Sequence, residues 1–303
     1  MKQPSILIVI LNWRQPELTI ACVKAVQAMD GPQFDLLLID NGSGDNSAEI
    51  LTDKLPDVQL LTLPENLGFA GGCNVGLRHA VEQGYTYALL LNNDAFPEVN
   101  MLQVLLGEMG GDVGMASPKV LYHPERDYVS FGGGRQHPSL LEVRDSKANQ
   151  KDRPAWQETE AVDYLWGTCW LVNLAALQTV GLLDERFFMY YEDLDWSIRF
   201  RQAGYRLLWV GKARLYHQES RSTGGTDSPL RRYYLARSSV IFFRRYAHQG
   251  RPLFIFFFRL GSAIKMVSRL LLKGRRASAG AYLRGLRDGW KLASGREYND
   301  AKR

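Results

Sequence analysis

The fold is decided by the stretch SILIVILNWRQPELTIACVKAVQAM, residues 5–29. Its first part, residues 5–11, is a continuous apolar run of the kind that forms a strand buried on both faces of a sheet. Its second part, residues 16–29, has apolar residues at helical spacing, and Pro16 suits the first turn of a helix. The stretch therefore predicts a buried strand followed directly by a helix. Because the apolar run is short and only one lysine precedes it, we expect a first strand rather than a signal peptide.

The same alternation continues to residue 94. Apolar runs at 35–40, 58–63 and 87–94 end in polar residues, and a second helical pattern covers 71–84. A series of this kind predicts an open α/β sheet, mostly parallel, with right-handed crossovers. In such sheets the ligand site lies beyond the carboxyl ends of the strands. The polar residues at or just after these ends are Asn12, Asp40, Asn66 and Asp94.

The composition is that of an ordinary soluble globular protein. The chain has 303 residues, of which 46% are hydrophobic and 23% charged, and this length allows one large domain with an appendage. The three cysteines, Cys22, Cys73 and Cys169, are odd in number and lack the spacing of a metal site. They indicate reduced thiols in a cytosol rather than a disulfide framework.

Charge is divided unevenly along the chain. Residues 231–303 contain 18 Lys/Arg and three acidic residues, whereas the first 230 residues carry a net charge of −10. Such a basic C-terminal part suggests an anionic partner. We therefore divide the chain into an α/β domain, 1–228, and a basic helical extension, 229–303.

The apolar stretch at 252–273 is long enough to span a bilayer, but Arg259, Lys265 and Arg269 lie within it. On a helix, its polar residues fall on one arc of roughly 120°. Each internal charge would cost about 2.5–3.5 kcal/mol at the bilayer centre. We therefore expect an amphipathic helix on an anionic membrane surface rather than a spanning helix. A helix packed on the α/β domain is the alternative.

Beyond residue 113 the pattern changes. Short apolar segments indicate strands of a mixed region. Between two of them, residues 135–160 are polar and poor in core residues, and we expect a mobile excursion there. A helix over about 194–203 and a strand at 205–210 follow.

Three carboxylates, those of Glu192, Asp193 and Asp195, lie within four positions of the stretch FFMYYEDLDWSIRFRQAGY, residues 187–205. Like charges this close raise one another's pKa, and aromatic neighbours reduce the screening by water. One interpretation is general-base chemistry, because burial increases the proton affinity of a carboxylate. The other is capping and dipole stabilisation at the start of a helix. Helical geometry points Asp193 and Asp195 to different sides, so one acid can serve chemistry while Asp195 and, in part, Glu192 cap the helix.

The glycine-rich segment NLGFAGGCNVG, residues 66–76, has two open interpretations. Its spacing and its place after the third strand do not fit a dinucleotide-binding fingerprint. Glycines at the start of a helix would let backbone N–H groups approach a phosphate or ribose. A tight turn without a ligand explains them equally well.

Further polar positions are candidates for ligand contacts. Asp40 can accept a hydrogen bond from a base N–H, whereas we expect Asp45 or Asn46 to cap a helix. The oxygens of residues 92–94, Asn-Asn-Asp, suit a hard divalent cation. His217 can complete that site, although a lone histidine is more often structural.

Taken in order, the motifs ILNW, DNGSGD, NLGFAGGCNVG, LLNNDAFP, GLLDERFFMYYEDLDWSIRFRQAGY and YHQES resemble those of family 2 glycosyltransferases of GT-A fold. More narrowly, they are similar to the bacterial rhamnosyltransferase-like branch that extends cell-surface polysaccharides. The resemblance covers about residues 5–240. It implies a nucleotide-sugar-binding catalytic domain of GT-A type over 1–228, with a membrane-associating helical extension.

The resemblance also implies roles for individual residues. Asp193 is the expected catalytic base, and Asp40 the expected contact to the pyrimidine of the donor. Asp94 and His217 are the expected ligands of Mg²⁺ or Mn²⁺, although the family's acidic triplet reads Asn-Asn-Asp here. The residues expected to contact the donor or the sugar are Leu11, Asn12, Asp40, Asn66, Gly71, Gly72, Asn74, Asn93, Asp94, Trp166, Glu192 and Arg231.

The reaction implied by the resemblance is an inverting single displacement from a nucleotide sugar. The expected donor is dTDP-L-rhamnose, with a UDP-sugar as the alternative, and the expected acceptor is a glycan on a polyprenyl diphosphate. We expect a peripheral enzyme at the cytoplasmic face of the bacterial inner membrane, with no nucleic-acid partner, and leave a homodimer open. Two other classes also stay open, a nucleotide-sugar-binding protein without turnover and a membrane-associated scaffold.

Overall fold

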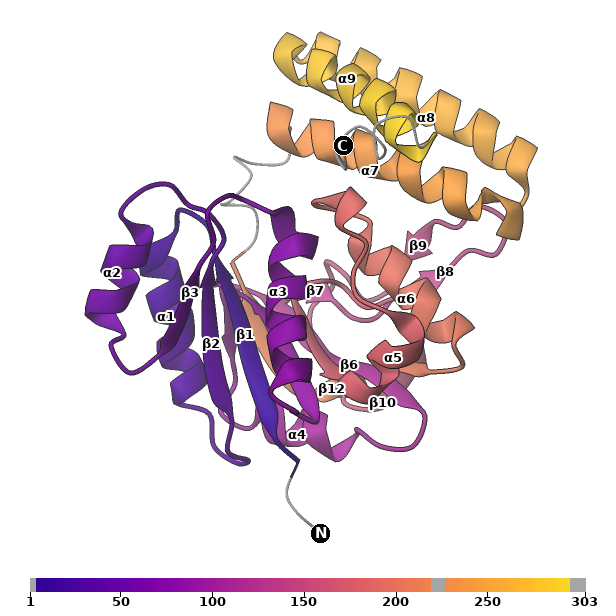
Figure 1. Ribbon diagram of the computed structural model, residues 1–303. Coiled ribbons are helices and arrows are strands. Elements are labelled where there is room, and N and C mark those ends of the chain that lie inside the picture. Colours follow the sequence, from indigo (N-terminus) through magenta and orange to yellow (C-terminus); the bar gives the residue numbers. More distant parts are fainter. Residues whose placement is uncertain (1–3, 219–226, 295–303) are drawn as a thin grey trace.

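The computed structural model describes residues 4–218 and 227–294 (Figure 1). A central sheet with helices on both faces forms the α/β part, and the helices α7, α8 and α9 lie together at one end of it (Figure 1). The order of strands in the sheet is β10-β12-β6-β11-β4-β1-β2-β3, with β5 paired to β12 and β7 to β6. The predicted α/β class is confirmed.

The first half of the sheet follows the predicted alternation of strands and helices. Its four strands are parallel, in the order β3-β2-β1-β4. Before α2, Asp45 Oδ1 accepts a hydrogen bond of 3.0 Å from Ser47 N in an Asx-type turn, whereas the side chain of Asn46, at the N-cap position, makes no capping hydrogen bond. The elements are β1 (Ile6–Asn12), α1 (Pro16–Gln27), β2 (Asp35–Asp40), α2 (Ser47–Lys54), β3 (Gln59–Thr62), α3 (Gly68–Glu82) and β4 (Tyr87–Asn92).

The second half makes the sheet mixed. The strand β11 runs antiparallel to both β4 and β6, and β12 is parallel to β6. The long strand β12 ends at His217, which pairs with Ala95 of β5 just after Asp94. The elements are β5 (Ala95–Pro97), α4 (Met101–Gly107), β6 (Val113–Tyr122), β7 (Val129–Phe131), β8 (Arg135–Gln136), β9 (Val143–Arg144), β10 (Thr159–Val162), β11 (Cys169–Asn173), α5 (Leu177–Val180), α6 (Glu192–Gln202) and β12 (Arg206–His217).

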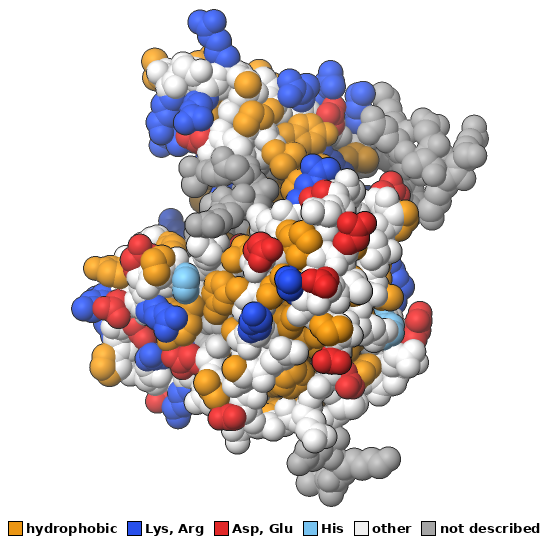
Figure 2. Space-filling model, turned by 90° about the vertical axis from the view of Figure 1, so that its left-hand side faces the viewer, with side chains coloured by type: hydrophobic (Ala, Val, Ile, Leu, Met, Phe, Trp, Pro, Cys, Tyr) orange, Lys and Arg blue, Asp and Glu red, His pale blue; other side chains and the backbone are white. Residues whose placement is uncertain are grey.

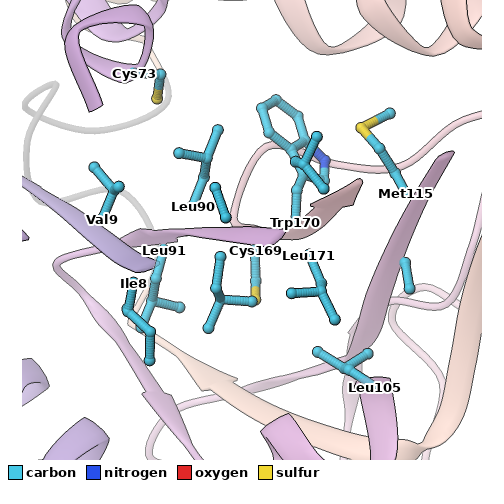
Figure 3. Close-up of a cluster of buried hydrophobic side chains, with 14 of the residues drawn as sticks. Ile8, Val9, Cys73, Leu90, Leu91, Leu105, Met115, Cys169, Trp170 and Leu171 are labelled. Atoms are coloured by element: carbon cyan, nitrogen blue, oxygen red, sulfur yellow. The ribbon is translucent and has the colours of Figure 1, made fainter. Parts of the chain in front are cut away.

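Both faces of the central strands are buried, as the continuous apolar runs predict. Successive strand residues point to opposite faces of the sheet, so neighbours in the sequence contact different layers (Figure 3). Cys73 of α3 covers one face, and Leu105 of α4 covers the other (Figure 3). The strand residues on the first face are Val9, Leu90, Trp170 and Met115, and those on the second are Ile8, Leu91, Cys169 and Leu171 (Figure 3). The three cysteines are buried free thiols, as expected.

The polar stretch at 135–160 differs from the expected mobile excursion. The strands β8 and β9 form a two-stranded sheet within it. The ammonium group of Lys147 is 2.9 Å from Glu160 and donates to the carbonyl of Gly132, whose own N–H donates to Asp145. These polar contacts hold the stretch against the main sheet. The expectation of mobility was wrong because it considered only apolar core residues, of which the stretch has few.

The helix α7 (Pro229–Tyr246) packs directly on α6. Its Ile241, Phe242 and Phe243 form a buried cluster with Leu194 and Ile198 of α6. The helix α6 begins at Glu192, two residues before the predicted start, so all three carboxylates lie in its first turn. The division of the chain at 228 and 229 stays a prediction, although α7 and the α/β part share this cluster.

The helix α9 (Arg276–Ala293) lies against α7 at short range. A Cβ atom added at Gly285 would lie 2.2 Å from the carbonyl oxygen of Tyr233, and one at Gly289 would lie 2.4 Å from that of Arg237. Only glycine at these two positions allows the backbones to approach this closely. The third helix, α8 (Pro252–Leu272), contacts α9 and covers one side of the pair.

Part of the polar arc of α8 faces the protein, while Lys265 is exposed and most of the apolar arc faces outward. Arg259 is 3.4 Å from Glu142, and Arg269 is 2.6 Å from Asp227, so two of the predicted headgroup-facing charges pair with acids of the chain. Basic and apolar side chains lie side by side on this helical part (Figure 2). Of residues 4–218 and 227–294, none belongs to a helix that is apolar over a length sufficient to cross a bilayer. The large apolar residues of α8 that are at least 40% exposed are Leu253, Phe254, Phe256, Phe257, Phe258, Leu260, Ile264, Leu271 and Leu272.

Candidate active site

Two adjoining pockets lie in this part of the molecule, the first of them at the carboxyl end of the parallel strands. The first, which we call the Asp94 pocket, has a volume of about 240 Å³. The ends of β1 and β4 and the loop after β2 form one side of it, and residues 188–189 with α7 form the other. Its polar lining consists of Asn12, Gln15, Asn41, Asn66, Asn92, Asn93 and Asp94, and Leu11, Trp13, Phe69, Phe188, Leu230 and Tyr234 add apolar and aromatic walls.

The second, which we call the Asp193 pocket, has a volume of about 340 Å³. Residues 188–189, 230 and 234 line the first pocket, whereas residues 190–191, 231 and 235 line the second. The two pockets therefore adjoin, and these two segments form the wall that they share. Its lining includes Glu142, Tyr164, Trp166, Tyr190, Tyr191, Asp193, Arg231, Leu235 and Phe243.

A buried chain of side chains connects the two pockets. Asp94 Oδ1, in the first pocket, lies 3.0 Å from Nε2 of His217, and both side chains are less than 10% exposed. The ring of Trp166, which lines the second pocket, contacts the His217 ring in a T-shaped arrangement with 5.6 Å between the ring centroids. Nδ1 of His217 is buried and has no partner within the described residues.

Asp193 is held in its pocket by a tyrosine. The hydroxyl of Tyr164 donates to Oδ2 of Asp193, and the backbone N–H of Leu194 donates to Oδ1 at 2.8 Å. Burial raises the pKa of Asp193, and the Tyr164 hydrogen bond opposes that rise. The pKa of Tyr164 is itself raised, by burial and by the charge of Asp193, so the phenol stays a neutral donor. Sequence reasoning missed Tyr164, since a tyrosine beside a short strand carries no signal of its partner.

Asp195 points away from Asp193, as helical geometry predicts. It is wholly buried and accepts hydrogen bonds from Arg199 of α6 and from Arg245 and Tyr246 of α7. Its role is structural, although it is an ion-pair centre within the helix rather than the expected capping residue. It could not be distinguished in the sequence because its partner Arg245 is 50 residues away.

Glu192 is a buried acid without a full set of partners. It is 5% exposed, and its Oε2 has no hydrogen-bond partner within the described part of the chain. Burial raises its pKa well above the ordinary value of 4.5, and the charge of Asp193 raises it further. Glu192 lines neither pocket, so no direct sugar contact is visible for it.

The wall between the pockets has an unusual backbone. Phe188, Tyr190 and Tyr191 all have positive φ, a conformation that costs about 1–3 kcal/mol for a residue other than glycine. The carbonyl of Phe188 accepts hydrogen bonds from Phe69 N and Ala70 N at the start of α3. The Phe188 ring also stacks on Tyr234 of α7 with 4.6 Å between centroids. Contacts from α3 and α7 therefore stabilise this wall.

The backbone N–H groups at the start of α3 are hydrogen-bonded within the chain. This agrees with a tight turn rather than with N–H groups free to approach a phosphate. Leu67 N donates to Asn41 Oδ1, Gly68 N to Asn66 Oδ1, and the next two N–H groups to Phe188. Gly71 and Gly72 are buried in helix packing, where a Cβ at Gly72 would lie 3.1 Å from Leu11.

Two other expected donor contacts lie outside the Asp94 pocket. Asp40 is 2% exposed beneath it, and its carboxylate accepts from Asn12 Nδ2 at 2.7 Å and from Ser43. It orients Asn12, which does line the pocket. Asn74 is farther away, bonded to Leu183 and Glu185 at the other side of α3. The arrangement brings together Leu11, Asn12, Asn66, Asn93 and Asp94 in one pocket and Trp166, Asp193 and Arg231 in the other.

The residues present offer part of a divalent-cation site. Asp94 and His217 supply an oxygen and a nitrogen donor at adjoining positions, a set that suits Mn²⁺ or Mg²⁺ when a diphosphate adds oxygens. In the described residues, no group of three His, Cys, Asp or Glu side chains could hold a metal. Phosphate oxygens of a bound ligand would add to the coordination of a cation at this pair.

Comparisons with known proteins agree with this arrangement. Residues 5–181 match the family described as Glycosyl transferase family 2. The N-acetylglucosaminyl-diphospho-decaprenol L-rhamnosyltransferase of Mycobacterium tuberculosis is 27% identical over 223 residues, which cover 62% of this chain and 68% of that protein. The dTDP-rhamnosyl transferase RfbF of Shigella flexneri is 23% identical over 208 residues, which cover 64% of this chain and 61% of that protein.

Solved structures share the fold. GalNAc-T7 with UDP, GalNAc and Mn²⁺ aligns with a TM-score of 0.61 at 16% identity, over 81% of this chain and 51% of that one. The mannosyltransferase PcManGT from Pyrobaculum calidifontis, with GDP-Man and Mn²⁺, aligns with a TM-score of 0.56 at 15% identity, over 100% and 81% of the two chains. Fold and site thus define a glycosyltransferase of GT-A fold. The chain belongs to glycosyl transferase family 2, as its motifs suggest.

The buried acid Glu192 generates a stability prediction. Because its pKa is raised in the folded protein, its contribution to stability is fully present below pH 4.5 and is lost as the pH rises through the raised pKa. At pH 8 the free energy of unfolding of Glu192→Gln is therefore expected to exceed that of the wild type by about 1.4 kcal/mol for each unit by which the pKa of Glu192 is raised. The variant should accordingly unfold at a higher temperature. The difference should shrink towards pH 4.5. Thermal unfolding followed by circular dichroism measures it, with the exposed Glu49→Gln as control; a difference that does not change with pH would contradict the prediction.

Proposed function

We propose that the protein is an inverting glycosyltransferase that moves L-rhamnose from dTDP-L-rhamnose to a hydroxyl group of a lipid-linked glycan. The observation that carries this proposal is the pair of adjoining pockets, one with amide and carboxylate groups at the strand ends, the other with Asp193 held by Tyr164. The relatives from Mycobacterium tuberculosis and Shigella flexneri are named as rhamnosyltransferases, which favours this sugar over that of a UDP-sugar donor.

The Asp94 pocket is suited to the nucleotide diphosphate. Flat aromatic walls from Trp13, Phe69 and Tyr234 border it, and amide side chains from Asn41 and Asn66 supply donors and acceptors for a pyrimidine. The roles expected for Asp40 and Asn12 fit here if Asp40 acts by orienting Asn12.

Asp193 is placed to act as the general base. The acceptor hydroxyl gives its proton to the Asp193 carboxylate while its oxygen forms a bond to the anomeric carbon of the sugar. The bond from that carbon to the diphosphate oxygen breaks at the same time, and the nucleoside diphosphate leaves with the electron pair. Attack from the face opposite the diphosphate inverts the configuration. The raised pKa of Asp193 makes it a stronger base than an exposed aspartate.

A divalent cation bound by Asp94 and His217 would neutralise charge on the leaving diphosphate. Asp94 lines the Asp94 pocket, and the buried imidazole of His217 lies next to its carboxylate. Trp166, which lines the Asp193 pocket, packs against this imidazole. Arg231 lines the Asp193 pocket and lies over the Tyr190 ring, where its guanidinium is close to the separating wall. Asn92 and Asn93 are neutral, so the triplet carries one negative charge, that of Asp94, and repels the diphosphate less than a triplet of acids would.

The proposed location is the cytoplasmic face of a bacterial inner membrane. The outward apolar arc of α8, with Leu253, Phe257 and Leu272 among its exposed side chains, suits the interface of a bilayer. The exposed basic residues, Lys265 of α8 and Arg276, Arg284, Arg287 and Lys291 of α9, suit anionic headgroups. A lipid-linked acceptor, as in the name of the Mycobacterium tuberculosis relative, would be present at the same surface.

The base is tested by Asp193→Asn. Its rate of transfer from dTDP-L-rhamnose to a polyprenyl-diphosphate-linked N-acetylglucosamine in the presence of Mn²⁺ should fall by at least about 100-fold, because the amide cannot take the proton. Binding of dTDP, which occupies the other pocket, should stay unchanged, and this is the control for folding. Equal rates for the variant and the wild type would defeat the enzymatic role. If the wild type transfers sugar faster from a UDP-sugar than from dTDP-L-rhamnose, the UDP-sugar is the donor instead.

Tyr164→Phe is a sharper test of how the base is tuned. The hydrogen bond from Tyr164 lowers the pKa of Asp193, so its loss should raise that pKa. Because the base acts only when deprotonated, the acid limb of the pH–rate profile should move to higher pH, while the rate at alkaline pH falls by no more than about tenfold. A profile with an unchanged acid limb would show that this carboxylate does not control the rate.

The membrane contact is tested by flotation with vesicles that contain phosphatidylglycerol. The double variant Phe257→Ser with Leu260→Ser should bind at least about tenfold more weakly, since each buried apolar side chain contributes about 1.5–3 kcal/mol. Val99→Ser, an equally exposed apolar residue of the α/β part, is the matched control. Wild-type binding should also weaken at high salt. If the double variant floats like the control, α8 does not bind the membrane.

A further inference from the structure

A groove between α7, α8 and α9 has no role in the reaction described above. Its volume is about 340 Å³, within the range of small-ligand sites. All three helices contribute apolar or aromatic side chains to it, and its polar surface is small. The side chains that matter here are Phe243 of α7, Ile255, Phe256 and Ala263 of α8, and Leu286 and Trp290 of α9.

Two guanidinium groups border this apolar groove. Arg259 lies 4.6 Å from the centre of the Phe243 ring, and Arg244 lies 4.2 Å from that of Trp290. The contact between Arg259 and Glu142 is long, at 3.4 Å. Guanidinium groups that are stacked on rings keep N–H donors at their edges for a phosphate. An apolar groove with such a border suits an amphiphile that has a phosphate head and a hydrocarbon tail.

The groove adjoins the Asp193 pocket. Phe243 lines both of them. Glu142 lines the pocket and contacts Arg259, which lines the groove. Phe243, Arg259 and Glu142 therefore lie between the two cavities, and a ligand that extends from the Asp193 pocket into the space between the helices would pass these side chains.

We propose that the groove binds the first isoprene units of the acceptor's polyprenyl chain, with the diphosphate at Arg259 and Arg244 and the glycan directed towards Asp193. This inference rests on the proposed lipid-linked acceptor. The remainder of the chain leaves past Phe256, which lines the groove and is 60% exposed on the outward face of α8. The same helix thus serves the tail of the acceptor on one side and the bilayer on the other.

The test measures binding separately from catalysis. Radiolabelled geranylgeranyl diphosphate, below its micelle concentration, is dialysed to equilibrium against the full-length protein. Saturable binding is expected, and Ala263→Trp, which fills the groove, should weaken it at least tenfold. Ile264→Trp, one position further on the exposed face of α8, is the matched control and should bind like the wild type. Arg259→Gln leaves the groove open and should also weaken binding at least tenfold, so the test does not depend on the folding of one variant.

Several outcomes would overturn the proposal. Equal binding by Ala263→Trp and the wild type would exclude the groove. Equal affinity for geranylgeraniol would exclude recognition of the diphosphate, and equally effective competition by dioleoyl phosphatidylglycerol would identify a general phospholipid site.

Transfer assays separate this proposal from the proposed function. The wild type is assayed on two acceptors, one with a long and one with a short lipid chain. If it is active on both, Ala263→Trp should have a kcat/KM at least tenfold lower on the long-chain acceptor and an unchanged kcat/KM on the short-chain acceptor. If the wild type transfers no sugar to either acceptor, the proposed function fails, whereas saturable binding of geranylgeranyl diphosphate would still support the groove as a prenyl diphosphate site.

Discussion

The candidate site depends on the buried carboxylate of Asp195. It is wholly buried, and its negative charge is compensated by Arg199 of its own helix and by Arg245 and Tyr246 of α7. Breaking a buried ion pair of this kind costs about 3–5 kcal/mol, because the remaining charge is left without a partner. The interaction therefore fixes the first turn of α6 against α7, and with it the direction in which Asp193 points.

The same constraint extends to the wall between the pockets. Arg245 also binds Asp184, and Ser238 of α7 donates to the carbonyls of Phe187 and Met189. These bonds hold the segment 188–191, whose positive φ angles would otherwise be unfavourable. A strained segment that is fixed from two sides keeps its position, so the wall that the donor and acceptor pockets share is well defined and the two pockets adjoin. The helix α7 is thus part of the site although it follows the β12 strand in the chain.

The three C-terminal helices are joined near their ends by another acid, Asp227. Arg232 of α7 and Arg269 of α8 both contact its carboxylate, and Ser278 of α9 donates to its backbone carbonyl. The hydrogen bonds and charges of these arginines lower the pKa of Asp227. Because Arg259 and Arg269 turn towards acids of the chain, α8 exposes most of its apolar residues. This inversion of the expected orientation creates both the outward apolar surface and the groove behind it.

The sequence alone determined the class of fold and the family. Continuous apolar runs predict buried parallel strands whatever packs on them, because both faces of such strands are covered, and motifs at strand ends are local enough to be recognised in order. It also identified Asp193 as distinct from Asp195, since helix geometry separates neighbours on one turn. Only the tertiary structure decided which groups face each other: Tyr164 with Asp193, Asp40 with Asn12, Asn74 with Leu183, and the arginines of α8 with Glu142 and Asp227. These partners are distant in the chain, and hydrogen bonds and ion pairs between distant residues depend on packing that no local pattern of residues records.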